Sequence, residues 1–182
     1  TAQRTMRTAQ QLYEGVDTGS GAIGLITYMR TDSVNLSDDA IGELREFIAE
    51  QYGADQLPKQ PRVFKTKSKN AQEAHEAIRA TSILRTPNEL QAHLTKDQFR
   101  LYELIWKRTI ACQMIHATMN TVAADLACDE GNLFRANGST IANPGFMAVY
   151  MESVDDAKKG DGDEKLLPPL EEGEQITLDK LR

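Results

Sequence analysis

The sequence has few cysteines, few histidines and no long hydrophobic run, and each shortage excludes a class of protein. Its 182 residues hold two cysteines, Cys112 and Cys128, too few for a disulfide scaffold or a four-thiolate zinc site. With only three dispersed histidines beside them, no metal site is predicted in this segment. No run of about 18 apolar residues occurs, so no membrane-spanning helix is predicted. The polar first residues are not typical of a signal peptide, and a reducing, cytoplasmic compartment is expected.

The chain also lacks an excess of basic residues, since its net charge is −6. Taken whole, that charge argues against non-specific binding to nucleic acid. The charge is unevenly distributed, however. Residues 1–118 hold 15 basic and 14 acidic side chains, whereas residues 119–182 hold 6 and 13. The first part is therefore nearly neutral and the second part is acidic, which predicts two regions of different character.

The first region reads as mainly helical. Apolar residues at helical spacing predict helices over about Thr5–Glu14, from an N-cap at Ser37 to Gly53, over Ala71–Ile78, and from a capping box at Thr95 and Gln98 to about His116. One short segment, Leu25–Thr31, is rich in β-formers and is predicted to be a strand.

The second region reads as β structure, because the period changes after Thr118. Strands are predicted at Val122–Cys128, Leu133–Ala136, Gly145–Met151 and Gln175–Leu181, with an acidic linker at Glu152–Glu164. The fold class is therefore α+β: a mainly helical domain over residues 1–116, followed by a partial antiparallel β domain over residues 117–182.

Two loops have compositions that could serve phosphate binding. Gly15–Gly24 is glycine-rich but lacks both the Gly-Lys-Ser/Thr ending of a P-loop and the GxGxxG spacing, so a flexible connection is the alternative. Lys59–Lys69 carries five basic residues and no acid. A basic loop of this kind either contacts phosphate groups or is solvated and mobile.

Tyr28 is the tyrosine whose surroundings suggest chemistry. It lies in the sequence TYMRTDS, and in an extended chain Tyr28, Arg30 and Asp32 would share a face. A phenol is a poor nucleophile at neutral pH. A neighbouring guanidinium can stabilise the phenolate and hold a phosphate through its fork of donors. The pair therefore suits attack on a phosphodiester, with a buried tyrosine beside a surface arginine as the alternative.

His75 lies in the sequence QEAHEAIR, on the predicted helix. His75 and Glu76 resemble the start of a zinc-protease motif, but Arg79 stands where the second histidine would be. His75 and Arg79 are four residues apart, so on a helix they could bind one phosphate together. A surface histidine paired with glutamate is the alternative.

These segments resemble the bacterial DNA topoisomerase I family, a group of type IA topoisomerases. The matching stretches are Thr8–Gly15, Gly24–Ser33, Gln72–Arg79 and Leu101–Trp106, with a weaker match at Phe134–Ser139 near Pro144–Phe146. They occur in the family's order along nearly the whole chain. Met29 favours topoisomerase I over topoisomerase III, which usually has proline there. Ala80 departs from the family's usual proline, and a changed helix end is expected.

The resemblance implies a role for each matching residue. Tyr28 would attack single-stranded DNA and form a 5′-phosphotyrosine intermediate, which allows strand passage and relaxation of negatively supercoiled DNA without ATP. Arg30 would hold the phosphate and stabilise the transition state. His75 would contact the same phosphate or its strand. The remaining members of the motif, Thr31, Asp32 and Ser33, would shape the turn and contact DNA.

The resemblance also implies a further domain that these 182 residues do not contain. The family binds magnesium in an acidic domain, and nothing here matches that domain. The chain is therefore expected to be an internal fragment, inactive alone, that acts with the acidic domain of its parent on DNA in the cytoplasm, at the nucleoid. Residues 1–116 would form the gate domain of the toroid and residues 117–182 part of the β-rich arch. The β part, from about Ala117, would carry an unpaired edge and be poorly ordered, swapped or dimer-forming.

Two other functions are distinguishable from the leading one. A non-catalytic DNA-binding module would leave every activity intact when Tyr28 is replaced by phenylalanine. A regulatory segment phosphorylated at Tyr28 would need that residue to be exposed and mobile.

Overall fold

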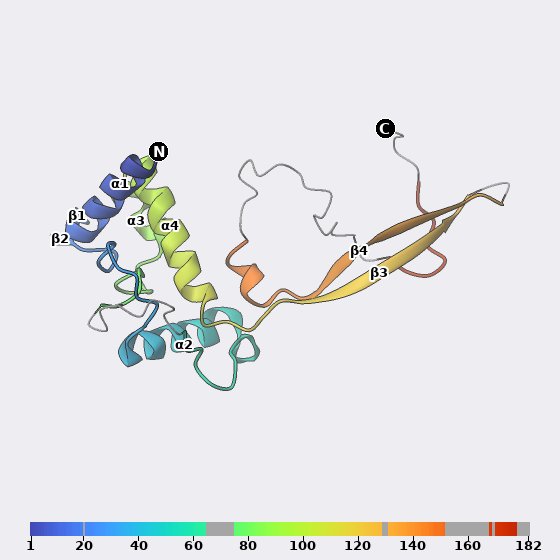
Figure 1. Ribbon diagram of the computed structural model, residues 1–182, viewed down its shortest axis with the longest axis horizontal. Coiled ribbons are helices and arrows are strands. Elements are labelled where there is room, and N and C mark those ends of the chain that lie inside the picture. Colours follow the sequence, from blue (N-terminus) through green and yellow to red (C-terminus); the bar gives the residue numbers. More distant parts are fainter. Residues whose placement is uncertain (20, 65–74, 129–130, 152–167, 169, 178–182) are drawn as a thin grey trace. The chain divides into compact units, whose positions relative to one another are not determined.

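The computed structural model describes residues 1–182 except 20, 65–74, 129–130, 152–167, 169 and 178–182 (Figure 1). The described residues form four α-helices, short 3-10 helices and two antiparallel strand pairs, which confirms the α+β class. The chain divides into two compact units. One holds Thr1–His116 and Gly145–Met151, and the other holds Ala117–Pro144 and Glu152–Arg182. The assignment of residues 1–116 to a gate domain and 117–182 to an arch domain stays a prediction.

The first two helices of the first unit form close to where the sequence predicts them. Helix α1 spans Ala2–Glu14 and α2 spans Asp38–Tyr52. The Ser37 hydroxyl accepts a hydrogen bond from the Ala40 amide at 3.4 Å, which caps the start of α2. Between the helices, the glycine-rich loop folds back on itself as two short antiparallel strands, β1 (Val16–Asp17) and β2 (Ala22–Ile23).

The last predicted helix is α4, which spans Lys96–Ala111 and ends before the predicted His116. Thr95 and Gln98 form the predicted capping box. Short turns of helix lie elsewhere in this unit: η1 (Ala54–Gln56), α3 (Pro87–Leu90) and η2 (Gln91–His93). Helices α1 and α4 pack against each other, as Figure 1 also shows.

The core of the first unit draws on every part of it. Its fully buried side chains come from α1, the segment before Tyr28, α2, α4 and the turn after α4: Leu12, Leu25, Ile26, Ile48, Tyr102, Ile110, Gln113 and Met114. The aromatic residues in this core contact each other edge to face, as Phe47 and Trp106 do with ring centroids 5.8 Å apart. The burial of Leu25 and Ile26 anchors the segment that leads to Tyr28.

Two of the predicted elements in this unit are wrong. Leu25–Thr31 is not a regular strand, because its only ladder contact within the described residues is an isolated bridge between Ile26 and Ala80, and the chain bends at Met29 and Arg30. Ala71–Ile78 is not a helix over residues 75–78, which are irregular, and residues 71–74 lie outside the described residues. Ala80 therefore ends no helix.

The second unit contains a long β-hairpin. Strand β3 spans Thr118–Ala127 and β4 spans Leu133–Asn143, paired antiparallel from end to end. Arg135 and Asp125 face each other across the pair at 2.6 Å. Within the described residues each strand pairs only with the other, so each has an edge without a strand partner.

The two later strands predicted for the β region do not form as predicted. Gly145–Ala148 is a 3-10 helix, η4, and it belongs to the first unit. Gly145 has a φ of +48°, and a Cβ there would lie 2.5 Å from the His116 carbonyl oxygen, so the chain turns at this point. Of the fourth strand, Gln175–Thr177 is irregular. The rest of it, and the acidic linker, lie outside the described residues. Among the described residues, no helix is long and apolar enough to cross a membrane.

Candidate active site

Tyr28 lies at the surface of the first unit, on the irregular segment that follows the buried Ile26. Its side chain is 38% exposed, whereas the next residue, Met29, is buried. The Tyr28 ring lies near two other rings. Its centroid is 5.4 Å from that of Tyr13, in edge-to-face geometry, and 5.8 Å from that of His75. The Tyr28 side chain is therefore partly accessible to solvent.

The contact between Tyr28 and His75 arises because two segments distant in sequence run side by side. The Thr27 amide donates to the Arg79 carbonyl at 2.9 Å, and the Thr81 amide donates to the Leu25 carbonyl at 3.0 Å. The isolated bridge between Ile26 and Ala80 lies between these two bonds. The predicted pairing of His75 with Arg79 on one helix face is thus replaced by pairing of both with the Tyr28 segment.

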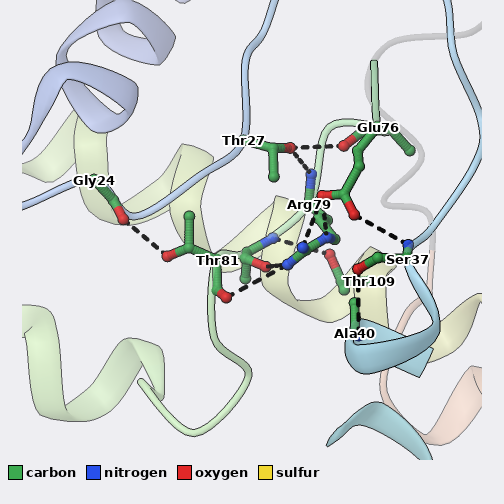
Figure 2. A network of polar contacts seen from close by, with 10 residues as sticks. Gly24, Thr27, Ser37, Ala40, Glu76, Arg79, Thr81 and Thr109 are labelled. Carbon is green, nitrogen blue, oxygen red and sulfur yellow. Dashed lines mark hydrogen bonds and ion pairs between the residues drawn. The ribbon is translucent and has the colours of Figure 1, made fainter. Parts of the chain in front are cut away.

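The Thr27 side chain adds a second connection between the segments. Its hydroxyl donates to the Ala77 carbonyl at 2.6 Å and accepts from the Arg79 amide at 2.9 Å, as Figure 2 shows. Further along the two segments, on the side away from Tyr28, the Thr81 hydroxyl donates to the Gly24 carbonyl at 2.8 Å. Because both capacities of the Thr27 hydroxyl are used, this side chain is fixed in one orientation.

Arg79 is engaged by Glu76 and is not available to a phosphate. Its Nη2 lies 2.7 Å from Glu76 Oε2, its Nε donates to the same oxygen at 3.0 Å, and its side chain is only 15% exposed. The other Glu76 oxygen accepts from the Ser37 amide at 3.0 Å, which ties this cluster to the start of α2 (Figure 2). Burial by itself raises the pKa of the Glu76 carboxyl. The Ser37 hydrogen bonds and the Arg79 charge outweigh burial and hold that pKa below its ordinary value.

The residues after Tyr28 form a tight, self-bonded turn. The Thr31 hydroxyl accepts from the Ser33 amide at 3.0 Å, and the Ser33 hydroxyl accepts from the Asn35 amide at 3.2 Å. Ser33 is buried, and Arg30 and Asp32 are exposed. In the part of the chain that the structure describes, Arg30 forms no hydrogen bond or ion pair. Its guanidinium is therefore not engaged by another described residue.

Sequence reasoning missed three residues that build this site. Tyr13 lies at helical spacing with apolar residues, which predicts a structural role, yet its ring contacts that of Tyr28. Thr27 and Glu76 were not singled out, although they hold the segments that carry Tyr28 and His75. The only sequence signal was their place beside those two residues, because the contacts join positions far apart in the chain.

The arrangement is suited to nucleophilic attack on a phosphate group. An exposed phenol next to an imidazole offers a nucleophile beside a hydrogen-bond donor. The Arg30 guanidinium lies two residues away, is engaged by no other described residue and offers a second donor group. Among residues 1–19, 21–64, 75–128 and the later described stretches, no group of three or more His, Cys, Asp and Glu side chains is placed to hold a metal ion.

Comparison with known proteins places these residues in a longer context. A family model described as DNA topoisomerase matches residues 1–182. A protein named DNA topoisomerase 1 from Xylella fastidiosa (strain Temecula1 / ATCC 700964) is 52% identical over 100% of this chain, which covers 22% of that protein. One of the same name from Rickettsia felis is 57% identical over 96% of the chain and is also covered to 22%.

A solved structure agrees with these sequence matches. Full-length topoisomerase I from Thermotoga maritima superposes with a TM-score of 0.62 and 37% identity, over 93% of this chain and 25% of that one. The chain thus spans about a fifth of the length of the curated relatives it matches.

Proposed function

The chain belongs to the DNA topoisomerase family, and on that premise we propose that it carries the nucleophile of a type IA topoisomerase, Tyr28. The observation that carries the proposal is the exposed Tyr28 ring in contact with His75, which a distant segment supplies. Since the chain spans 22% of its relatives, the activity is proposed for a full-length protein that includes it.

In the proposed reaction, Tyr28 Oη attacks the phosphorus of a phosphodiester in single-stranded DNA. The phosphorus–oxygen bond to the 3′ side breaks, the phenolic proton is released, and the departing 3′ oxygen takes up a proton. The product is a 5′-phosphotyrosine, and a second strand passes through the break. The 3′-hydroxyl then attacks the phosphotyrosine, which restores the DNA and frees Tyr28. No ATP is consumed, because the phosphotyrosine bond conserves the energy of the phosphodiester.

Arg30 and His75 supply the donors in this proposal. Negative charge grows on the non-bridging oxygens of the phosphate during attack, and a fork of guanidinium donors stabilises it. His75 lies next to the Tyr28 ring and donates to the same phosphate or its strand. Thr31, Asp32 and Ser33 set the turn after Tyr28 and contact the DNA near it.

Two further parts of the proposal concern groups outside these residues. Magnesium would bind to the acidic domain of the parent chain. The described residues offer no cluster for it, so no step here uses the metal. The same domain would supply the proton for the departing 3′ oxygen, and the 182 residues alone are therefore expected not to cleave DNA.

The proposed activity takes place in the cytoplasm, at the nucleoid. The edges of β3 and β4 that have no strand partner among the described residues would be covered in the parent, or by a non-native dimer of the isolated chain.

The test uses a full-length protein in which these 182 residues replace the matching stretch of the Xylella fastidiosa relative. It is mixed with a single-stranded oligonucleotide and magnesium, and the adduct that resists denaturant is measured. Tyr28→Phe is expected to abolish the adduct and the relaxation of supercoiled DNA. Tyr52→Phe, at the end of α2, is the matched control and is expected to retain both. An adduct that persists in Tyr28→Phe would refute the proposal and favour a DNA-binding role for this segment.

A further inference from the structure

The distance between Tyr28 and His75 is not set by a helix or a regular sheet. Both residues lie in irregular segments, and each side chain is at least partly exposed. Residues in such segments have more conformational freedom than residues in helices. The ring contact at 5.8 Å therefore depends on specific contacts that hold the two segments together.

Thr27 is one of these contacts. It immediately precedes Tyr28. Its hydroxyl forms hydrogen bonds with the Ala77 carbonyl and the Arg79 amide, which lie two and four residues after His75. Threonine is stiff about χ1, and both of its hydrogen bonds run to backbone atoms. Thr27 thus fixes the backbone on which His75 sits relative to the backbone on which Tyr28 sits.

Glu76 is the second contact, and it immediately follows His75. Its carboxylate accepts hydrogen bonds from the Ser37 amide on one side and from the Arg79 guanidinium on the other. Ser37 also caps α2, a regular helix of 15 residues. Glu76 therefore connects the segment of His75 to a rigid element (Figure 2).

We propose that Thr27 and Glu76 are positioning residues that hold His75 beside Tyr28, so that a phosphate attacked by Tyr28 lies within reach of the imidazole. The inference rests on the proposed function of Tyr28 and His75. Neither Thr27 nor Glu76 touches the DNA in this scheme. They act by limiting the conformations of the segment that carries His75, and a misplacement of about 1 Å at a reacting centre lowers a rate by about a hundred-fold.

The test compares two threonines that join the same pair of segments. Thr27→Val keeps the shape of the side chain but removes both hydroxyl hydrogen bonds. Thr81→Val removes the bond to the Gly24 carbonyl on the other side of the Ile26–Ala80 bridge, together with the bond that the Thr81 hydroxyl accepts from Arg85. In the full-length protein described above, Thr27→Val is expected to lower the rate of adduct formation at saturating oligonucleotide by about ten-fold or more. Thr81→Val is expected to leave it near wild type, and Thr27→Ser, which keeps the hydroxyl, to restore it.

A double-mutant cycle shows whether Thr27 acts through His75. If it does, Thr27→Val lowers the rate far less in a His75→Ala background than in wild type. Glu76→Gln gives a second route to the same result, should Thr27→Val fail to fold. It keeps the size of the side chain and removes the charge that holds Arg79.

The outcomes separate this inference from the proposed function. If the adduct does not require Tyr28, the proposed function fails. If the adduct requires Tyr28 but Thr27→Val matches Thr81→Val, the positioning inference fails alone. Effects of Thr27→Val and His75→Ala that multiply independently would overturn it as well.

Discussion

Replacing Gly24 by alanine tests the packing that presents Tyr28. A Cβ added at Gly24 would lie 2.7 Å from the carbonyl oxygen of Tyr13, at the end of α1. The carbonyl oxygen is a backbone atom, and the position of a Cβ is fixed by the backbone, so neither atom can rotate away. The neighbouring Leu25 amide donates to the Leu12 carbonyl at 2.8 Å, and the Thr81 hydroxyl holds the Gly24 carbonyl from the other side. The segment is therefore fixed on both sides, and the clash must be relieved by separating it from α1.

The cost follows from the two interactions that this separation disturbs. Forcing an extra methyl group into a packed site costs about 1–3 kcal/mol, and weakening the Leu25 hydrogen bond adds about 1 kcal/mol. Gly24→Ala is thus expected to lower the free energy of unfolding by about 2–4 kcal/mol. It should also loosen the Tyr13–Tyr28 contact, because Tyr13 carries the carbonyl oxygen involved.

Trp106 makes the measurement simple, because it is the single tryptophan of the chain and is buried in the same unit as Gly24. Urea unfolding is followed by its fluorescence in wild type, Gly24→Ala and Gly42→Ala. Gly42 lies inside α2 with open space around its added Cβ, so alanine there is expected to stabilise the helix by about 0.5–1 kcal/mol. If Gly24→Ala were as stable as wild type, the close approach of the segment to α1 would be refuted.

Two further predictions concern titratable groups. The Glu76 pKa is held below its ordinary value of 4.5, so the carboxylate stabilises the fold above that pH and its contribution is lost as the pH falls through the lowered pKa. The gap in unfolding free energy between wild type and Glu76→Gln should be full at pH 7 and close in acid; a gap that does not change with pH would contradict this. Burial raises the pKa of the Cys112 thiol to about 11, whereas Cys128 is exposed. Iodoacetamide at pH 8 should therefore label Cys128 long before Cys112, as peptide mass spectrometry would show, and equal rates would refute the burial of Cys112.

The elements that the sequence predicted correctly are those whose signals are local. Ser37 begins α2 and Thr95 begins α4 because their side chains accept hydrogen bonds from amides three residues ahead. The alternation of apolar residues after Thr118 likewise predicted β3. Such patterns need only neighbours in sequence, and they survive in the folded protein.

The errors lie where contacts between distant segments decided the conformation. Residues 75–78 have the composition of a helix, but pairing of Arg79 and Thr81 with the Tyr28 segment favours an irregular backbone there. Gly145–Ala148 has the composition of a strand, but its close approach to His116 requires a turn. A helical propensity of a few tenths of a kcal/mol per residue is smaller than the combined effect of several buried hydrogen bonds.

The candidate site divides in the same way. The sequence by itself determined the helical caps, the change from helical to β structure, and Tyr28, Arg30 and His75 as the residues of interest. Only the tertiary structure decided that His75 lies against Tyr28, that Arg79 is occupied by Glu76, and that Tyr13 and Thr27 belong to the site. The physical reason is that a hydrogen bond or a ring contact depends on distance in space, and the chain brings these segments together only when its apolar residues are buried in one core.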